Sequence, residues 1–160
     1  MRGVCGTPNP EQLVRAAMNL AAEGAARGDA PFGAVLVSPQ GEVVSMASNR
    51  QVSAEDPTAH AELELLRAAT RAGARPPLRG YTVAVNAEPC SMCASALVKA
   101  GVGALVYGAP HEPHMDPDLG VDDVFARAAN PPRVTAGVLA DEAAAQIASL
   151  RAAAAARPID

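Results

Sequence analysis

The chain has 160 residues, enough for a sizeable core, and we expect one domain over 1–160. Its formal net charge is −4 and Lys99 is the only lysine among 13 basic residues, which argues against a nucleic-acid-binding face and favours a small-molecule partner. No run approaches the roughly 20 apolar residues of a membrane span, and the first residues lack a secretory-signal pattern, so we expect a cytoplasmic protein without membrane contact.

The first third of the chain carries a helical pattern and then two strand patterns. Asn9, Pro10 and Gln12 have the form of a helix N-cap, a first-turn proline and an N3 partner. Two short apolar runs flank the turn residues 39–41, as in a hairpin. The predicted elements are a helix over 10–26, strands over 33–38 and 42–47, and a loop over 48–57.

The rest of the chain alternates helices and strands. Asp56 and Pro57 again have the form of a cap and a first-turn proline, and Gly101 marks the stop of a later helix. The predicted elements are a helix after Pro57 that runs up to Gly73, a strand at 81–85, a helix at 90–100, a strand at 103–107, a loop at 108–120, a short element near 124, a strand at 133–139 and a helix from 141 to about 156. This alternation indicates an α/β protein with a mixed sheet covered on both faces.

Three residues in this pattern are typical zinc ligands. His60, Cys90 and Cys93 provide one ligand fewer than a closed structural zinc site uses, which leaves a position for water. Both cysteines fall in the first turn of a predicted helix, where the helix dipole favours thiolate over thiol. We therefore expect a Zn²⁺ cofactor. Glu62 follows His60 by two residues, and we expect it to carry a proton between water and a leaving group rather than to bind the metal.

Other interpretations of the same residues remain at this point. A structural zinc site would need Cys5, His111 or His114 as a fourth ligand. A thioredoxin-like disulfide would leave His60 and Glu62 without a role. A third possibility is a non-catalytic zinc-binding interaction module.

The motif DPTAHAE at 56–62, taken with EPCSMC at 88–93, resembles the nucleobase and tRNA branch of the cytidine-deaminase-like superfamily. The resemblance extends from about residue 10 to residue 150. It implies a three-layer α/β/α sandwich with a central mixed five-stranded sheet, zinc-dependent hydrolytic deamination of a cyclic amidine, and a homodimer. It also implies that Glu88 is a structural acid rather than a catalytic one.

Two members of this branch resemble different parts of the chain. PFGAVLV at 31–37 and GVDD at 120–123 are similar to bacterial guanine deaminases, which implies that Phe32 stacks on the base and that Asp123 binds substrate or shuttles protons. VYGA at 106–109 and the stretch 132–147 are similar to bacterial tRNA adenosine deaminases instead. Asn49 matches a position that contacts the base in both.

From these matches we expect the substrate to be a small amino-purine, pyrimidine or triazine, with guanine as one candidate and a tRNA wobble adenosine as the alternative. Val121 is smaller than its guanine-deaminase counterpart, and no aromatic residue marks the C-terminal segment, so guanine itself is not assigned. In this interpretation Asn49 fixes the polar edge of the base, and the Ala61 N–H and Glu62 hold its carbonyl or ring nitrogen.

The substrate contacts each have a structural alternative. Phe32 could be core, Asp123 could cap the helix near 124, and Asn49 could be a turn residue. His111 and His114, in the loop that we expect to border the pocket, are further candidates for substrate contact, and the alternative for both is exposure to solvent.

Overall fold

The computed structural model describes residues 8–113 and 115–158, so Cys5 and His114 lie outside the described residues. Its centre is a five-stranded sheet in the order β2-β1-β3-β4-β5. Strand β1 is antiparallel to β2 and β3, whereas β3, β4 and β5 are parallel, which confirms the predicted mixed sheet. The strands are β1 (Gly33–Val37), β2 (Val43–Ser48), β3 (Thr82–Ala87), β4 (Ala104–Ala109) and β5 (Arg133–Thr135).

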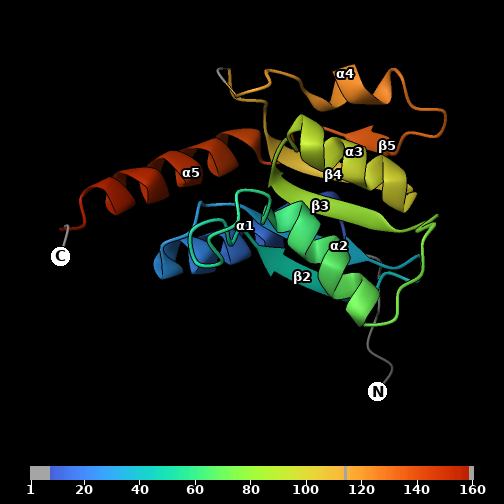
Figure 1. Ribbon diagram of the computed structural model, residues 1–160, viewed down its shortest axis with the longest axis horizontal. Coiled ribbons are helices and arrows are strands. Elements are labelled where there is room, and N and C mark those ends of the chain that lie inside the picture. The colour runs from blue at the N-terminus through green and yellow to red at the C-terminus, as the bar shows by residue number, and fades with distance from the viewer. Residues whose placement is uncertain (1–7, 114, 159–160) are drawn as a thin grey trace.

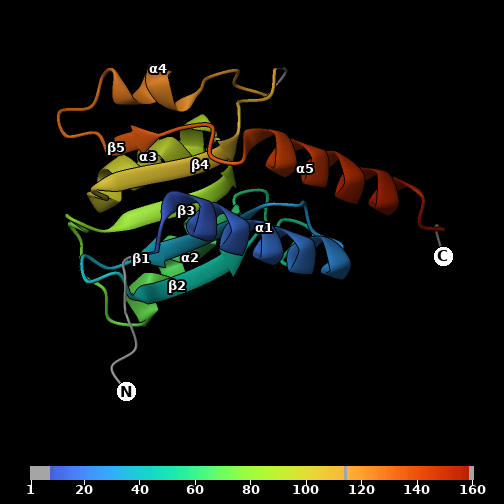
Figure 2. The ribbon, with the colours of Figure 1, turned by 180° about the vertical axis from the view of Figure 1, so that it is seen from behind.

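Helices cover both faces of this sheet, as Figure 1 and the reverse view in Figure 2 show. Helices α2 and α3 lie on one face, and α1 and α5 lie on the other. In the described part of the chain no helix has the length and apolarity to cross a bilayer. The helices are α1 (Pro10–Arg27), α2 (Ala61–Arg71), α3 (Ser91–Ala100), α4 (Val121–Phe125) and α5 (Ala140–Ala155).

The central strands are buried on both faces because their side chains alternate between two cores. Leu36 and Val85 pack with the residues of α2 and α3, while Val35 and Ala84 pack with those of α1 and α5. A strand that is buried on both faces reads as a continuous apolar run, which is how β1 appears in the sequence. These two cores hold the strand ends, and therefore the loops that follow them, in fixed positions.

The start of the first helix confirms the capping pattern in the sequence. The Asn9 side chain accepts the backbone N–H of Gln12, and the Gln12 side chain accepts that of Asn9, both at 2.9 Å. Gly28 then ends α1 in a left-handed conformation that glycine adopts without strain.

Two predicted boundaries are wrong. The second helix begins at Ala61 rather than directly after Pro57, because Asp56 forms a local turn in which it accepts both the backbone N–H and the hydroxyl of Thr58. The strand predicted at 133–139 is only three residues long, and its side chains are exposed, so little buried surface extends it. Leu139, in a left-handed conformation, then precedes α5.

The sheet topology brings the loops that carry the predicted site residues to one end of the strands. Because β1 runs antiparallel to β2 and β3, the residues before β1 lie at the same end of the sheet as those that follow β2 and β3. The parallel strand β4 also ends there. Four loops that are far apart in the sequence therefore meet beside the start of α2.

Candidate active site

The starts of two helices bring the predicted zinc ligands together. His60 and Cys90 are the N-cap residues of α2 and α3, and Cys93 lies in the first turn of α3. The Nδ1 atom of His60 is 3.5 Å from the Sγ atom of each cysteine, and the three ligand atoms all lie within 4.8 Å of one another. Tetrahedral zinc, with Zn–S of about 2.3 Å and Zn–N of about 2.0–2.1 Å, separates sulfur from nitrogen by about 3.5–3.6 Å. The donor set and its spacing therefore fit Zn²⁺.

The two thiols share one proton when no cation is present. Two hydrogen bonds lower the pKa of Cys90 to about 4. The bond from Cys93 has the larger effect, and the bond with His60 has the smaller one. The same hydrogen bond and burial raise the pKa of the Cys93 thiol. The hydrogen bond with Cys90 raises the pKa of His60. A bound dication would displace the remaining proton, since zinc coordinates thiolates and neutral imidazole.

Glu62 lies beside this ligand set but in a different chemical environment. It is 5% exposed, and its Oε2 atom accepts a 3.4 Å hydrogen bond from the Cys93 thiol. Burial raises the pKa of Glu62 above its ordinary value, so the carboxyl group can hold a proton more readily than a surface glutamate can. A carboxyl group with these properties is suited to accept and return protons.

A cavity of about 300 Å³ opens over the ligands and Glu62. This volume is at the lower end of the range for small-molecule sites. Its wall comes from the residues before β1, after β2, after β3 and after β4, from the start of α2 and from α5. The lining residues are Ala30, Phe32, Asn49, Gln51, His60, Ala61, Glu62, Ala87, Glu88, Cys90, Pro110, Glu112, Met115 and Arg151.

Three of the residues predicted to contact substrate line this cavity. Phe32 is partly buried and packs against both cores as well. Asn49 is buried, and Gln51 takes up one lone pair of its Oδ1 atom and one hydrogen of its Nδ2 atom. An amide in this state can still offer one acceptor and one donor to a ligand. Ala61 is the first residue of α2, where a backbone N–H has no partner within the helix.

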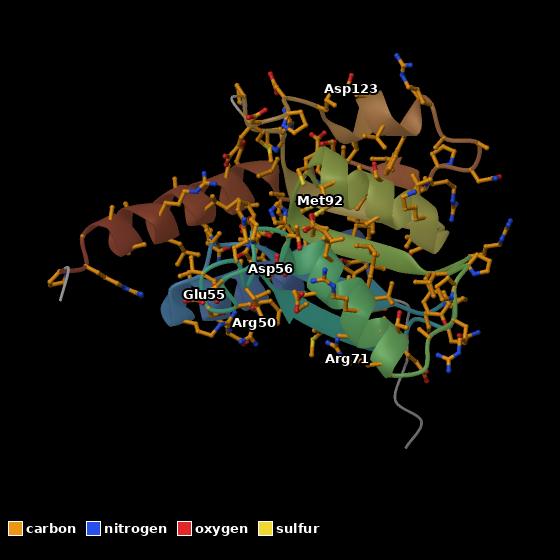
Figure 3. The ribbon with its side chains drawn as sticks, viewed as in Figure 1. Arg50, Glu55, Asp56, Arg71, Met92 and Asp123 are labelled. Atoms are coloured by element: carbon orange, nitrogen blue, oxygen red, sulfur yellow. The ribbon has the colours of Figure 1, made fainter. Side chains whose placement is uncertain are left out.

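Asp123 and His111 do not line the cavity. The Asp123 carboxylate is exposed and accepts the Gly120 N–H at 2.9 Å, which is the arrangement of a helix cap. Figure 3 places Asp123 on α4, far from Arg50 and Asp56 in the loop before α2. The His111 ring instead binds Asp118 at 2.6 Å. The structure therefore brings Phe32, Asn49 and Ala61 to the ligands and Glu62, but not these two side chains.

Sequence reasoning missed three polar residues of the cavity lining, Gln51, Glu112 and Arg151. Gln51 orients Asn49 through two hydrogen bonds. Asn and Gln are common in loops, so the sequence alone does not indicate this contact. Glu112 and Arg151 form an ion pair at 2.7 Å between two segments 39 residues apart. Arg151 lies in an alanine-rich helix with no recognisable motif around it, so only the folded structure indicates a role.

Glu88, expected to be a structural acid, joins two walls of the site. Its Oε2 atom accepts the His111 N–H at 2.9 Å, and its Oε1 atom accepts the Val121 N–H at 3.0 Å. A side chain at Gly120 would come within 2.6 Å of the same carboxylate. Glu88 thus holds both ends of the 110–120 loop next to β3, the strand that precedes α3.

The comparisons with known proteins agree with this geometry. Residues 7–109 match the family described as the cytidine and deoxycytidylate deaminase zinc-binding region. The guanine deaminase of Bacillus subtilis is 35% identical over 118 residues, which are 73% of this chain and 74% of that enzyme. A solved tRNA:A34 deaminase, which performs A-to-I editing at the wobble position of transfer RNA, superposes with a TM-score of 0.75 and 33% identity over 84% of this chain and 97% of that one.

Another relative is much longer than this chain. The tRNA(Ile)-lysidine synthase of Deinococcus deserti is 38% identical over 146 residues, which are 89% of this chain. The chain spans only 27% of that protein's length. The shared region therefore corresponds to one part of the larger protein.

Proposed function

The chain belongs to the family of the cytidine and deoxycytidylate deaminase zinc-binding region and has the fold of its zinc-dependent hydrolytic deaminases, and from this premise we propose that it hydrolyses the exocyclic amino group of a small nucleobase-like heterocycle. The candidate substrates are guanine and related amino-purines, pyrimidines and triazines. The observation that carries the proposal is a buried carboxyl group, Glu62, beside three ligands in a cavity of about 300 Å³.

In the proposed mechanism, His60, Cys90 and Cys93 hold Zn²⁺. Zinc held there would supply a water molecule whose pKa is lowered towards about 7. Glu62 takes a proton from the attacking water as the water oxygen bonds to the amino-bearing carbon, and it delivers that proton to the amino nitrogen. The C–N bond then breaks and ammonia leaves as a neutral molecule, while the second proton of the water stays on the product as the N–H of its ring amide. The raised pKa of Glu62 favours both the uptake and the retention of the transferred proton between the two transfers.

Other cavity residues bind and orient the ring in this proposal. Phe32 supports one face of the heterocycle, since aromatic rings favour offset stacking. Asn49 uses its remaining donor and acceptor on the polar edge of the ring. The Ala61 N–H donates to a carbonyl oxygen or a ring nitrogen. Together these contacts bring the amino-bearing carbon within reach of Glu62.

The experiment is an ammonia-release assay of the zinc-loaded protein on a panel of guanine, cytosine, adenine, isocytosine, 8-oxoguanine and aminotriazines. We expect turnover of at least one ring. Glu62→Gln, which keeps the shape of the side chain, should retain zinc and lose activity by about 10²- to 10⁴-fold. Absence of turnover on every ring, or full activity in Glu62→Gln, would refute the proposal.

A second candidate, deamination of adenosine in tRNA, is favoured by one specific observation. The solved tRNA:A34 deaminase is covered over 97% of its length at 33% identity. The net charge of −4 and the presence of three acidic residues in the cavity lining weigh against a polyanionic substrate. An anticodon stem-loop in the same assay separates the two, since binding of the RNA would weaken steeply with salt.

The proposal also includes a homodimer in the cytoplasm. The dimer follows from the family resemblance. Light scattering after size-exclusion chromatography should give about twice the 16.2 kDa mass of the chain. A monomeric mass in an active preparation would remove the dimer from the proposal.

A further inference from the structure

The side chains of Arg151 and Glu112 stand where the cavity meets solvent. Both line the cavity, and they are joined at 2.7 Å, yet their side chains are 48% and 46% exposed. Pro110, two residues before Glu112 in the same loop, is also an exposed residue of the lining. Glu62 and Asn49, by contrast, are buried. The most exposed part of the lining therefore lies between α5 and the loop that holds Glu112, and we call Arg151 and Glu112 the rim pair.

The rim pair also covers the aromatic residue in the wall. The guanidinium of Arg151 is 5.5 Å from the centroid of the Phe32 ring, within the range of a cation–π contact. Arg151 is thus held on one side by the Glu112 carboxylate and on the other by the ring. It is the one lysine or arginine among the described residues that line the cavity. Its position depends on both partners.

Among the described residues that line the cavity, the charged groups other than Arg151 and the zinc ligands are acidic. Both oxygens of Glu88 accept backbone N–H groups, and Glu62 is buried at the floor. One carboxylate oxygen of Glu112 pairs with Arg151, so the Glu112 carboxylate compensates the positive charge of Arg151 at the rim. A phosphate at the opening would have to displace a carboxylate from Arg151 and would lie next to that carboxylate afterwards.

We propose that the rim pair of Arg151 and Glu112 determines specificity by favouring a free heterocycle over the same ring attached to a sugar. This inference rests on the proposed function. A free ring can lie wholly at the buried end of the cavity beside Glu62, but a ribose bonded to it would extend toward the exposed end of the lining and part the pair. Parting the pair removes an ion pair and a cation–π contact together. Nucleosides and nucleotides are thereby selected against.

The test compares binding of guanine with guanosine, and of adenine with adenosine, by calorimetry on the zinc-loaded Glu62→Gln protein. This background allows equilibrium measurement without turnover. The variants are Arg151→Ala and Glu112→Ala, each added to that background. The matched control is Arg15→Ala, which breaks the Arg15–Glu142 pair between α1 and α5; its side chains are similarly exposed, at 54% and 55%, and it does not line the cavity.

We expect the preference for the free base over its nucleoside to fall by about three- to tenfold in Arg151→Ala and Glu112→Ala, in line with one exposed ion pair and one cation–π contact, and to stay unchanged in Arg15→Ala. An unchanged preference in both rim variants overturns the inference, although the proposed function stands if the free bases still bind. Tighter binding of GMP than of guanosine, lost in Arg151→Ala, would also overturn it, because Arg151 would then be a phosphate-binding residue.

A different result would distinguish failure of the proposed function. If neither free base binds the parent protein and active protein deaminates an anticodon stem-loop, both the proposed function and the rim selectivity are refuted. Thermal unfolding of each variant shows whether it is folded, and Arg151→Lys, which keeps the charge, should restore part of the preference.

Discussion

Two loops form opposite parts of the cavity wall, and they are held by different kinds of interaction. The loop after β2 is anchored by Asp29, whose side chain is fully buried and accepts the N–H groups of Val52 and Ser53, the Ser53 hydroxyl and the Arg27 guanidinium. The 110–120 loop is anchored at both ends by Glu88 but along its length by exposed ion pairs.

This difference separates a fixed wall from an adjustable one. Arg27 donates to the carbonyl of Asn49 at 3.0 Å, so the buried network reaches a residue that we expect to orient the base. Buried, charge-assisted hydrogen bonds are strong and costly to break, whereas exposed ion pairs are worth about 0–1 kcal/mol. The chain therefore places its rigid contacts next to the reacting ring and its weak contacts at the opening.

The largest effect should come from Asp29→Ala. It leaves the Val52 and Ser53 N–H groups and the Ser53 hydroxyl without their acceptor, while Arg27 keeps its bonds to Ser48 and the Asn49 carbonyl, and we expect a loss of about 3–5 kcal/mol in the free energy of unfolding. Urea unfolding of the zinc-loaded protein measures it. Asp56→Ala, in the same loop but with exposed hydrogen bonds to Thr58, is the control and should cost clearly less. Equal losses would contradict the contrast between the two walls.

A smaller effect is expected at the anchor of the other wall. Glu88→Gln replaces one acceptor oxygen by an NH₂ group that faces the N–H of His111 or Val121, with an expected loss of about 1–3 kcal/mol. Because Glu88 holds the loop rather than reacting, we expect KM to change more than kcat on whichever ring is turned over. A kcat that falls while KM is constant would instead place Glu88 in the chemistry.

The ion pair at the rim should contribute least to stability. A double-mutant cycle on Arg151 and Glu112 should give a coupling of about 0–1 kcal/mol. The same cycle on Arg27 and Asp29 should exceed it, since the Asp29 side chain is buried. A rim coupling as large as that of the buried pair would remove the distinction between fixed and adjustable walls.

The two walls should also respond to pH in opposite directions. Burial alone raises the pKa of Asp29, but hydrogen bonds from Ser53 and Arg27 outweigh it and lower the pKa, so its stabilisation is present above about pH 3.9 and is lost as the pH falls through the folded-state value. The hydrogen bond that the His111 ring donates to Asp118 raises the pKa of His111, so that contribution is complete below about pH 6.5 and is lost as the pH rises through the folded-state value.

Unfolding free energies across the pH range test this opposition. The difference between the parent protein and Asp29→Asn should shrink in acid, while the difference between the parent and His111→Gln should shrink as the pH rises above neutrality. The second difference is expected to be small, because Asp118 is 63% exposed and solvent screens the contact. Two differences that change in the same direction would contradict the assignment.

The sequence anticipated the parts of the site that depend on local structure. The ligands and Glu62 could be named because a cap residue followed by a helical pattern places side chains at a helix start, and short spacings such as those in 60–62 and 90–93 keep their meaning in any fold. The central strands were visible because burial on both faces produces an uninterrupted apolar run. Asn49 was predicted from the family resemblance, and in the structure it lines the cavity.

Tertiary structure alone decided which distant residues meet. The contacts of Glu88 with His111 and Val121 span 23 and 33 residues, and the contact of Arg151 with Glu112 spans 39. Such pairs depend on strand order and on where a helix lies against the sheet, which no local pattern encodes. For Asp123 the sequence left two possibilities, substrate contact and a helix cap, and in the structure its carboxylate accepts the Gly120 N–H as a cap does. Short-range sequence patterns thus determined the reactive groups of this protein, and long-range packing determined the walls and the opening around them.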